Sequence, residues 1–430
     1  MNWKLRKLDE IGGVYSGSTP STSVPDFWDG SITWITPNDL SKLSTPYISH
    51  SARTLSEKGL KNSSTHLLPA RSIVISSRAP IGYIAIPLIA FCTNQGCKSI
   101  ELNEGYNPEF VYYNLNFHVD KLKNLGNGTT FTEITKTALC SVELPFPKQE
   151  EEQAGIAAVL SCIDREIEQT EALIAKHHRI KMGLMQDLLT KGIDKQGNIR
   201  SEATHEFKDS PLGRIPSEWA AQTVGVFLER AKGFVQTGPF GSQLHAYEYL
   251  PEGVPVIMPQ DISDDEVSTS QIAKVSESKA AKLSRHRVRL NDLVFARRGD
   301  LSRVAGISDR EVGWLCGTGC LLMRVGLEKL NASWFATAYR FYLAQRQVEA
   351  LAVGSTMPNL NTSVISNLLF AFPPVVEQDT IMRSLFAQEM QIKKTADYLN
   401  KLLVLKQGLM QDLLTGALKV NKLFAASRRI

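Results

Sequence analysis

Two segments of the chain carry mainly apolar residues in a pattern that repeats every seven positions. The pattern extends from Leu160 to Leu188 and again from Ile392 to Leu413, with intervals of three and four residues in alternation. Such spacing forms one stripe along one face of a helix, which is typical of a coiled-coil seam. We therefore predict two long helices whose seams contain Ile163, Ile167, Ile174, Leu184, Leu188, Ile392, Leu399, Leu402, Leu409 and Leu413.

Each predicted helix follows a segment that contains prolines, at residues 145–147 and 373–374. Proline ends the preceding element because it has no amide hydrogen to donate. The polar residues Thr170, His177 and Lys181 interrupt the first seam, so each helix could instead pack on the globular part before it. Two matched helices in one chain favour mutual pairing.

The segments before the two helices have a different pattern. They are rich in Gly, Pro, Ser and Thr and contain short β-type runs, with fewer helical stretches. This pattern predicts a mixed α+β fold with many loops. The predicted strands lie at residues 73–75, 81–86, 293–295 and 321–325, and the predicted helices at 107–125 and 332–352.

The chain contains an internal duplication. The octapeptide GLMQDLLT at residues 183–190 recurs without change at residues 408–415. An identity of this length is the mark of a repeat, and its period is too long for a solenoid, so we predict two copies of one unit in tandem. The correspondence extends to the pairs Glu152 and Glu377, Trp3 and Trp219, Arg78 and Arg298, and Cys97 and Cys320.

This organisation predicts five parts. Each copy has a globular domain and a helical segment, and a turn-rich joint links the first helix to the second domain. The predicted boundaries are 1–149 for the first domain, 150–208 for the first helix and joint, 209–375 for the second domain, 376–420 for the second helix and 421–430 for a tail.

Composition narrows the class of protein. The 430 residues are 43% hydrophobic, which is too many for a disordered chain. The longest apolar stretch, residues 81–92, is interrupted by Pro87, and the charged start lacks a signal-peptide core, so we expect neither a membrane span nor secretion. Six scattered cysteines indicate a reduced, cytoplasmic protein. The net charge of +4 is small, so any nucleic acid must be bound by local patches.

Catalytic motifs are absent from the sequence. It contains no Walker A sequence, no dinucleotide fingerprint, no His-Glu-x-x-His and no Asn/Asp-Pro-Pro-Tyr/Phe. Asp261 with Glu277 and Lys279 imitates a nuclease site, but the first copy has no match for it. The cysteine pairs 92/97 and 316/320 have spacings wider than a zinc knuckle, so we expect buried thiols. We predict no catalytic residue and no metal site.

Basic residues of the second domain gather in one segment. Arg285, Arg287 and Arg289 alternate with other residues, so a strand would present three guanidinium groups on one face. That geometry suits phosphate contacts, and arginine also binds guanine with two hydrogen bonds. A solvated strand face is an equally good explanation of the same pattern.

Several short motifs, in a fixed order, together resemble the specificity subunit of Type I restriction–modification systems. The resemblance covers essentially all of residues 1–420 and rests on the duplicated arrangement more than on any single motif. The motifs are SRAPIG at 77–82, TNQGC at 93–97, GPFGS at 238–242, FARRG at 295–299, GSTMPN at 354–359, the joint segment 207–219 and both octapeptides.

The resemblance implies an α+β protein with two target recognition domains in direct repeat, separated and held by two helices that pair as an antiparallel coiled coil. Each domain is expected to recognise one half of an asymmetric, bipartite site on double-stranded DNA. The coiled coil is expected to set the spacer and dock two methyltransferase subunits, and restriction–translocase subunits would join for cleavage. The chain itself is expected to bind no cofactor, because the partner subunits use S-adenosylmethionine, Mg²⁺ and ATP.

The candidate DNA contacts follow from the basic residues, the Gly-rich loops and the resemblance. They are Thr19, Asn38, Ser77, Arg78, Asn94, Gln95, Lys98 and Thr130 in the first domain, and Ser242, Gln243, Gln260, Arg285, Arg287, Arg289, Arg297, Arg298 and Arg303 in the second. Two other functions remain open at this point. The chain could be a coiled-coil scaffold that binds only protein, or the specificity portion of a fused methyltransferase–nuclease.

Overall fold

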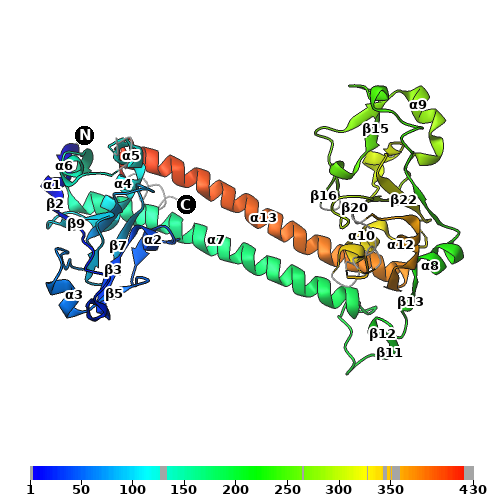
Figure 1. Ribbon diagram of the computed structural model, residues 1–430, viewed down its shortest axis with the longest axis horizontal. Helices are drawn as coiled ribbons and strands as arrows, with labels where there is room; N and C mark the ends of the chain where they lie inside the picture. Colours follow the sequence, from blue (N-terminus) through cyan, green and yellow to red (C-terminus); the bar gives the residue numbers. More distant parts are fainter. Residues whose placement is uncertain are drawn as a thin grey trace, which may run out of the picture. The chain divides into compact units, whose positions relative to one another are not determined.

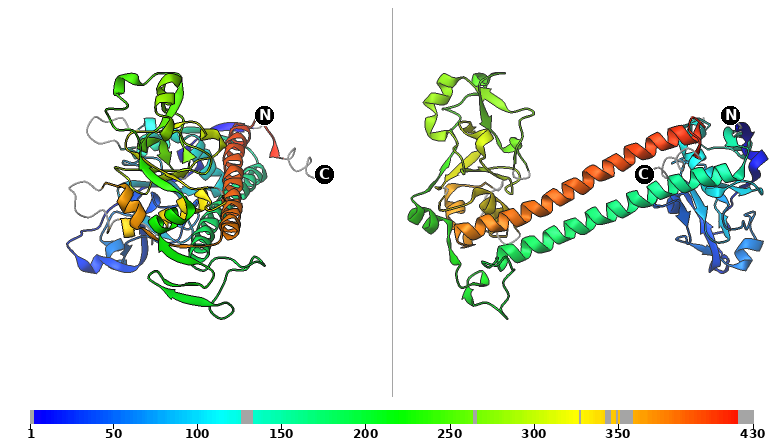
Figure 2. Two further views of the ribbon diagram at one scale, coloured as in Figure 1. Left: turned by 90° about the vertical axis from the view of Figure 1, so that its right-hand side faces the viewer. Right: turned by 180° about the vertical axis from the view of Figure 1, so that it is seen from behind.

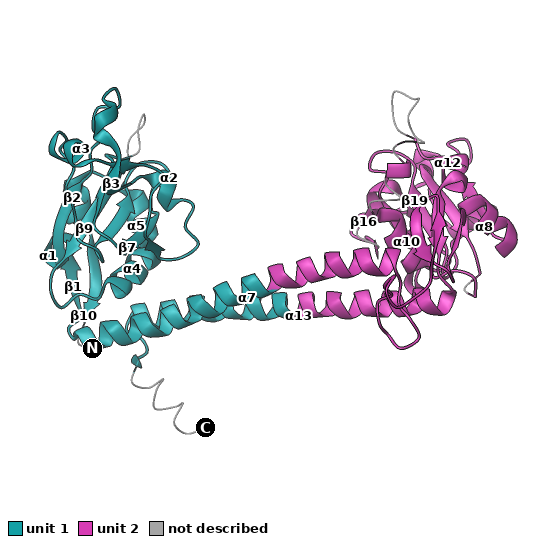
Figure 3. Ribbon diagram, turned by 90° about the horizontal axis from the view of Figure 1, so that it is seen from below, with its two compact units in different colours: residues 1–173, 395–430 teal, residues 174–394 magenta. Residues whose placement is uncertain are grey.

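The chain forms two compact units, each of which contains parts of both long helices. The structure, a computed structural model, describes residues 3–125, 133–263, 266–326, 328–341, 346–348, 350 and 359–420. Unit 1 comprises residues 1–173 and 395–430, and unit 2 comprises residues 174–394 (Figure 3). The helices α7 (Glu150–Thr190) and α13 (Val375–Leu414) each pass from one unit into the other.

Unit 1 is built on a five-stranded sheet in the order β2-β9-β6-β7-β4 (Figure 1). The pairs among β2, β9, β6 and β7 are antiparallel, and β4 joins β7 in parallel. A smaller sheet has the order β5-β3-β8. The strands are β2 (Gly12–Ser16), β9 (Cys97–Leu102), β6 (Ile73–Ser76), β7 (Ile84–Pro87), β4 (Tyr47–Ile48), β5 (Thr54–Leu55), β3 (Trp28–Ile35) and β8 (Phe91–Thr93).

The first three residues of β6 are all apolar, without the alternation that is typical of a strand with one exposed face. Successive side chains of a strand point to opposite faces. Ile73 and Ile75 enter the core that includes α4 (Pro108–Phe117), whereas Val74 enters a second core with Ile35 and Phe91. A strand buried on both faces therefore requires the continuous run Ile-Val-Ile.

Helix α4 begins at the residues that the chain provides for capping. Asn107 accepts a hydrogen bond from the amide of Phe110, and Pro108 occupies the first helical position. The other short elements of unit 1 are α1 (Leu8–Ile11), α2 (Pro37–Leu40), α3 (Glu57–Lys61), α5 (Val119–Asn124), α6 (Lys136–Cys140) and the antiparallel pair β1 (Trp3–Lys7) and β10 (Glu143–Pro147).

Unit 2 repeats the topology of unit 1. Its four-stranded antiparallel sheet has the order β14-β22-β19-β20, which corresponds to β2-β9-β6-β7, and its three-stranded sheet β18-β15-β21 corresponds to β5-β3-β8. The duplication seen in the sequence is therefore also a duplication of fold. The strands are β14 (Phe234–Thr237), β22 (Cys320–Arg324), β19 (Leu293–Ala296), β20 (Val304–Gly306), β18 (Ala273–Val275), β15 (Val254–Ile257) and β21 (Leu315–Cys316).

The remaining elements of unit 2 lie around these sheets. The antiparallel pair β13 and β23 corresponds to β1 and β10. These elements are β11 (Phe207–Ser210), β12 (Gly213–Pro216), β13 (Ala220–Thr223), α8 (Val224–Ala231), β16 (Ile262–Ser263), β17 (Glu266–Val267), α9 (Glu277–Lys282), α10 (Ala332–Arg340), α12 (Thr362–Asn367), β23 (Leu369–Phe372) and short 3₁₀ turns that include η3 (Pro259–Asp261) and η4 (Ser284–His286).

The two long helices pack against each other in antiparallel orientation within each unit (Figure 2). In unit 1 the first half of α7 meets the second half of α13, where Lys406 Nζ lies 2.6 Å from Asp164 Oδ1. In unit 2 the second half of α7 meets the first half of α13, where Lys181 Nζ lies 3.2 Å from Glu389 Oε2. The predicted pairing of the helices is confirmed, and the ends of the helices also pack on the globular cores.

The burial of α7 follows the three-four spacing. Among residues 165–183, only Ile167, Thr170, Ile174, His177 and Lys181 are buried or half-buried. The polar members have partners. Thr170 donates to a carbonyl one turn back, Gln388 donates to the carbonyl of His177 at 3.1 Å, and Lys181 forms the ion pair just described. The polar positions are therefore compatible with a helix pair because each one is hydrogen-bonded.

Each copy of the repeated octapeptide packs into the core of the other copy's globular part. Leu188, from the helix of the first copy, is buried in the core of unit 2. Leu413, its counterpart from the second copy, is buried in the core of unit 1 together with Leu414. Each copy's helix thus begins on its own globular part and ends on the other one.

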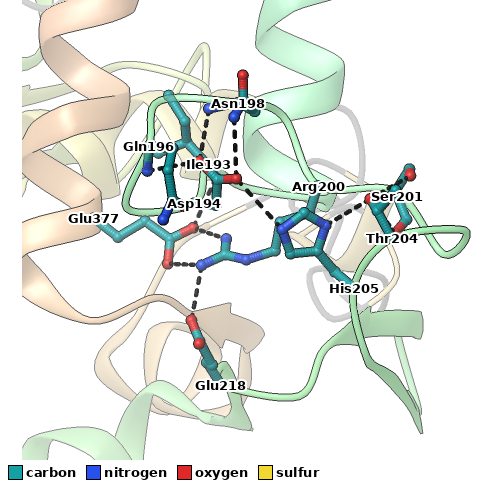
Figure 4. Close-up of polar contacts among 10 residues, drawn as sticks. All are labelled: Ile193, Asp194, Gln196, Asn198, Arg200, Ser201, Thr204, His205, Glu218 and Glu377. Carbon is teal, nitrogen blue, oxygen red and sulfur yellow. Dashed lines mark hydrogen bonds and ion pairs between the residues drawn. The ribbon is translucent and has the colours of Figure 1, made fainter.

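The joint after α7 is anchored to the first turn of α13 by the buried carboxylate of Glu377 (Figure 4). This carboxylate accepts hydrogen bonds from the amide of Ile193 at 2.9 Å, from Trp219 Nε1 at 3.2 Å and from the guanidinium of Arg200. Gly192, at φ +68°, passes so close to Glu377 that a Cβ atom would collide with it. Burial of two opposite charges is tolerated here because both are paired and hydrogen-bonded.

In unit 1 the corresponding place has different chemistry. Gly416, at φ +74°, lies two residues after the end of α13, and a Cβ atom there would lie 3.2 Å from the indole of Trp3, the counterpart of Trp219. Glu152, the counterpart of Glu377, is only half-buried. Val420 then enters the core of unit 1. The segment after α13 therefore packs against unit 1, just as the joint after α7 packs against unit 2.

Replacing Glu377 by Gln should destabilise unit 2, because the guanidinium of Arg200 would remain buried without its main counter-charge. We expect the free energy of unfolding to fall by about 3 kcal/mol. The matched substitution Glu152→Gln should change it by less than about 0.5 kcal/mol. Chemical denaturation followed by tryptophan fluorescence measures both. Equal midpoints for the two variants would contradict an anchoring role of Glu377.

Candidate nucleic-acid interface

Three loops of unit 1 meet at one edge of the five-stranded sheet. Residues 17–20 follow β2, residues 77–78 follow β6, and residues 94–96 precede β9. Because β9 lies between β2 and β6 and runs antiparallel to both, its start adjoins the ends of the other two strands. We call these loops, with Lys98, Asn38 and Glu133, the first loop cluster.

Hydrogen bonds hold the first loop cluster together. The amide of Gly17 donates to the carbonyl of Cys97 at 3.3 Å, and the amide of Ser77 donates to that of Gly96 at 2.8 Å. The hydroxyl of Thr19 donates to the side chain of Gln95. The backbone of the sheet thus fixes where these polar side chains begin.

An ion-paired triad lies within the first loop cluster. Glu133 Oε1 is 3.2 Å from Lys98 Nζ, and its Oε2 is 2.9 Å from Arg78 Nε. Lys98 is buried and also donates to Ser77 Oγ at 3.3 Å, whereas Arg78 is exposed. Burial alone would raise the pKa of Glu133, but hydrogen bonds and positive charge from Lys98 and Arg78 outweigh it and lower that pKa. Glu133 is therefore an anion at neutral pH.

The structure brings most first-domain candidates together. Thr130 lies outside the described residues. Lys98 points into the protein toward Glu133, which its place in the sequence did not indicate. The gathered candidates are Thr19, Asn38, Ser77, Arg78, Asn94, Gln95 and Lys98.

Unit 2 has an equivalent second loop cluster. Residues 238–243 follow β14, residues 297–303 follow β19, and residues 317–319 precede β22. The amide of Gly238 donates to the carbonyl of Cys320 at 2.9 Å, and that of Arg297 to Gly319 at 2.8 Å.

The turn η3 joins the second loop cluster through a side chain. Arg303 Nη1 donates to the carbonyl of Pro259 at 3.2 Å, which brings Gln260 to the same edge. The cluster therefore contains the candidates Ser242, Gln243, Gln260, Arg297, Arg298 and Arg303.

One more backbone hydrogen bond occurs at the equivalent place in both clusters. The amide of Ile134 donates to the carbonyl of Ser77 at 2.8 Å, and the amide of Leu360 donates to the carbonyl of Arg297 at 2.9 Å. The residue before each of these amides, Glu133 in one cluster, is thereby held beside the loops. Glu133 was not among the candidates predicted from the sequence, because it is 55 residues from Arg78. The signal in the sequence was the preceding tripeptide GTT, which corresponds to GST in the second copy.

The predicted strand face of three arginines is wrong. Arg285 lies in η4, Arg287 pairs with Glu277, and the amide of Arg289 donates to Asp292 at 2.7 Å. Side chains thus bind backbone groups that a strand would pair with a neighbouring strand. Arg324 Nη2 likewise donates to the carbonyl of Arg287 at 2.7 Å.

Arg287 and Arg289 are also separated from the second loop cluster. The carbonyl of Arg287 accepts from Arg324, at the end of β22, and the amide of Arg289 donates to Asp292, just before β19 starts, whereas Arg297 and Arg298 follow the end of β19 at Ala296. Arg287 and Arg289 therefore lie toward the opposite end of the same sheet, and the carbonyl of Arg285 accepts from Gln236 of β14 at 2.8 Å. The role of all three as DNA contacts stays a prediction.

Four of the six cysteines lie in the cores, whereas Cys140 is half-buried and Cys162 is exposed. Cys92, Cys97, Cys316 and Cys320 are free and buried, as expected. Burial raises the pKa of Cys92 to about 11, so this thiol is protonated at neutral pH.

Within the described parts of the chain, no group of three or more His, Cys, Asp or Glu side chains could hold a metal ion. None of the described helices is long and apolar enough to cross a membrane.

Comparisons with known proteins agree on one family. The family described as Type I restriction modification DNA specificity domain matches residues 1–176 and 245–402. The MjaIX specificity subunit of Methanocaldococcus jannaschii is 27% identical over 428 residues, which cover 98% of this chain and 95% of that protein. The EcoR124I/EcoR124II specificity subunit of Escherichia coli is 29% identical over 216 residues, 49% of this chain and 47% of that protein.

Solved structures share the fold. The S subunit of a Type I restriction–modification system from M. genitalium has a TM-score of 0.53 at 18% identity, covering 96% of each chain. The HsdS subunit from Thermoanaerobacter tengcongensis has a TM-score of 0.54 at 17% identity, covering 97% of each chain.

Proposed function

The chain belongs to the Type I restriction–modification DNA specificity family, as a non-catalytic specificity subunit, and on this premise we propose that each loop cluster recognises one half of a bipartite, asymmetric target on double-stranded DNA. The observation that carries the proposal is the equivalent gathering of polar loops at one sheet edge in each unit. Base edges are recognised by such donors and acceptors, and phosphates by arginine and backbone amides.

The two clusters share a backbone frame but differ in side chains. Ser77 and Arg78 in one cluster correspond to Arg297 and Arg298 in the other, and Lys98 corresponds to Leu321. Because different donors and acceptors select different bases, the two half-sites should differ in sequence.

We also propose that the paired helices dock two methyltransferase subunits. Exposed apolar side chains on α13 support this: Val376, Phe386 and Val404 are 76%, 64% and 71% exposed. Contiguous exposed apolar side chains mark sites of protein interaction, and Leu403 and Leu405, on either side of Val404, are 46% and 48% exposed. Restriction–translocase subunits would join this complex for cleavage. Adenine methylation and cleavage would then use S-adenosylmethionine, Mg²⁺ and ATP held by the partner subunits.

Exchange of the second domain tests whether recognition is modular. Replacing residues 209–375 with the matching domain of a relative should change one half-site and leave the other intact, because each unit has its own core and loop cluster. Methylome sequencing of cells that carry the chimera and its methyltransferase partner gives the result. New bases in both half-sites would contradict independent recognition.

The location of the DNA face can be tested with two arginines from one sheet. Arg298→Ala, in the second loop cluster, should weaken specific binding by about 1–3 kcal/mol if Arg298 contacts a base. Arg289→Ala removes an equally exposed charge at the other end of the sheet and should change binding by much less. Fluorescence anisotropy with the target duplex measures both. A larger effect of Arg289→Ala would place the DNA at the wrong end for this proposal.

The length of the paired helices is expected to set the spacer between the half-sites. One heptad added to each helix, after Ile174 and after Leu399, keeps the seam in phase. It lengthens the helices by about 10 Å, close to three base pairs, but three base pairs also rotate the duplex by roughly 100°. We expect a longer spacer with weaker binding, or loss of specific binding.

Selection from a DNA library with randomised spacer length tests the lengthened protein with its methyltransferase partner. Full affinity for the original spacer would contradict the proposal that the helices set it. Changed half-site bases would contradict the separation of spacing from base recognition.

A further inference from the structure

Glu133 joins a buried cation to an exposed one in the first loop cluster. Its carboxylate contacts Lys98 Nζ at 3.2 Å and Arg78 Nε at 2.9 Å. The side chain of Lys98 is 5% exposed, and that of Arg78 is 47% exposed. The triad therefore leads from the interior of unit 1 to its surface, with the arginine outermost.

The inner half of the triad is fixed. Lys98 extends from β9 and also donates to Ser77 Oγ at 3.3 Å. A buried ammonium group requires a counter-charge, since its desolvation is otherwise uncompensated. Lys98 therefore holds the carboxylate of Glu133 in place, and the amide of Ile134, bonded to the carbonyl of Ser77, holds its backbone.

The outer half leaves one edge of an arginine available. Arg78 uses Nε for Glu133, and within the described residues neither of its Nη atoms has a hydrogen-bond partner. A guanidinium is planar, so fixing Nε restricts the direction of both Nη atoms. Two parallel N–H groups match O6 and N7 of guanine in the major groove.

We propose that Glu133 is a positioning residue that directs Arg78 toward a guanine in the half-site recognised by the first domain. This inference rests on the proposed function. The negative charge of Glu133 also makes a base a better binding partner for Arg78 than a phosphate. The carboxylate of Glu133, 32% exposed, reduces the positive potential around Arg78 and so weakens its attraction for a phosphate, whereas the neutral guanine edge requires only hydrogen-bond donors.

The second loop cluster offers a natural comparison. Leu321 replaces Lys98 and Asn359 replaces Glu133 there, so the triad has no charged counterpart. In the described part of the chain no ion pair involves Arg298. Of the two equivalent arginines, Arg78 and Arg298, Arg78 is therefore the one held by a carboxylate in the described part of the chain, and the proposed guanine contact is assigned to it.

The test uses the full chain with its methyltransferase partner and a duplex library in which both half-sites are randomised. Arg78→Ala should reduce the preference for guanine at one position of one half-site by about 10-fold or more. Glu133→Gln should reduce preference at the same position, because an amide cannot accept from both cations as the carboxylate does. Total binding to non-target DNA should stay equal or rise, since a negative charge is lost.

A matched control comes from the same domain. Arg71 and Glu109 form an ion pair of 2.8 Å near the start of β6, at the other end of that strand from Ser77. Arg71→Ala and Glu109→Gln should leave every base preference unchanged. Thermal unfolding of all four variants verifies that each is folded.

Each failure has a distinct signature. Uniform loss of affinity for all sequences with Arg78→Ala, together with a weaker salt dependence, would make Arg78 a phosphate contact and overturn the inference. An unchanged guanine preference with Glu133→Gln would overturn the positioning role. If the wild-type complex selected no sequence at all, the proposed function itself would fail.

Discussion

Burial of the repeated leucines in exchanged cores is the constraint on which the rest of the structure depends. Leu188 completes the core of unit 2 and Leu413 that of unit 1, although each belongs to the helix of the other copy. A buried leucine contributes about 1.5–3 kcal/mol relative to an exposed one. Each core therefore requires the far end of a 40- or 41-residue helix, and both helices must run antiparallel to supply it.

The loop clusters are a second consequence of the repeated fold. The same strand order and the same backbone hydrogen bonds place loops at one sheet edge in both units, while the side chains on those loops differ. Backbone hydrogen bonds do not depend on side-chain identity, so the frame can persist while the side chains on it change. The contrast between Lys98 with Glu133 in one unit and Leu321 with Asn359 in the other shows how far this divergence extends.

Charges in this protein are arranged as local pairs more than as a continuous basic surface. Glu377 balances the charge of Arg200 at the joint, and Glu133 balances that of Lys98. Asp292, the residue before β19, balances the charge of Arg324. The small net charge is consistent with this arrangement. Such pairs orient individual side chains, and the pair of Glu133 with Lys98 is the one of these three that belongs to a loop cluster.

The sequence alone determined the features that rest on local pattern or on identity. The heptad spacing predicted both helices, the octapeptide established the duplication, and apolar runs predicted strands such as Leu293–Ala296, because side-chain periodicity follows directly from backbone geometry. Tertiary structure decided the rest. Arg285, Arg287 and Arg289 alternate as in a strand, yet Arg285 lies in η4, and Asp292 and Arg324 bind backbone groups of Arg289 and Arg287. Glu133 meets Arg78 only when the sheet brings them together, and the octapeptide gave no sign that each copy would enter the core of the other. Contacts between residues distant in the chain depend on how elements pack, and no local pattern records that.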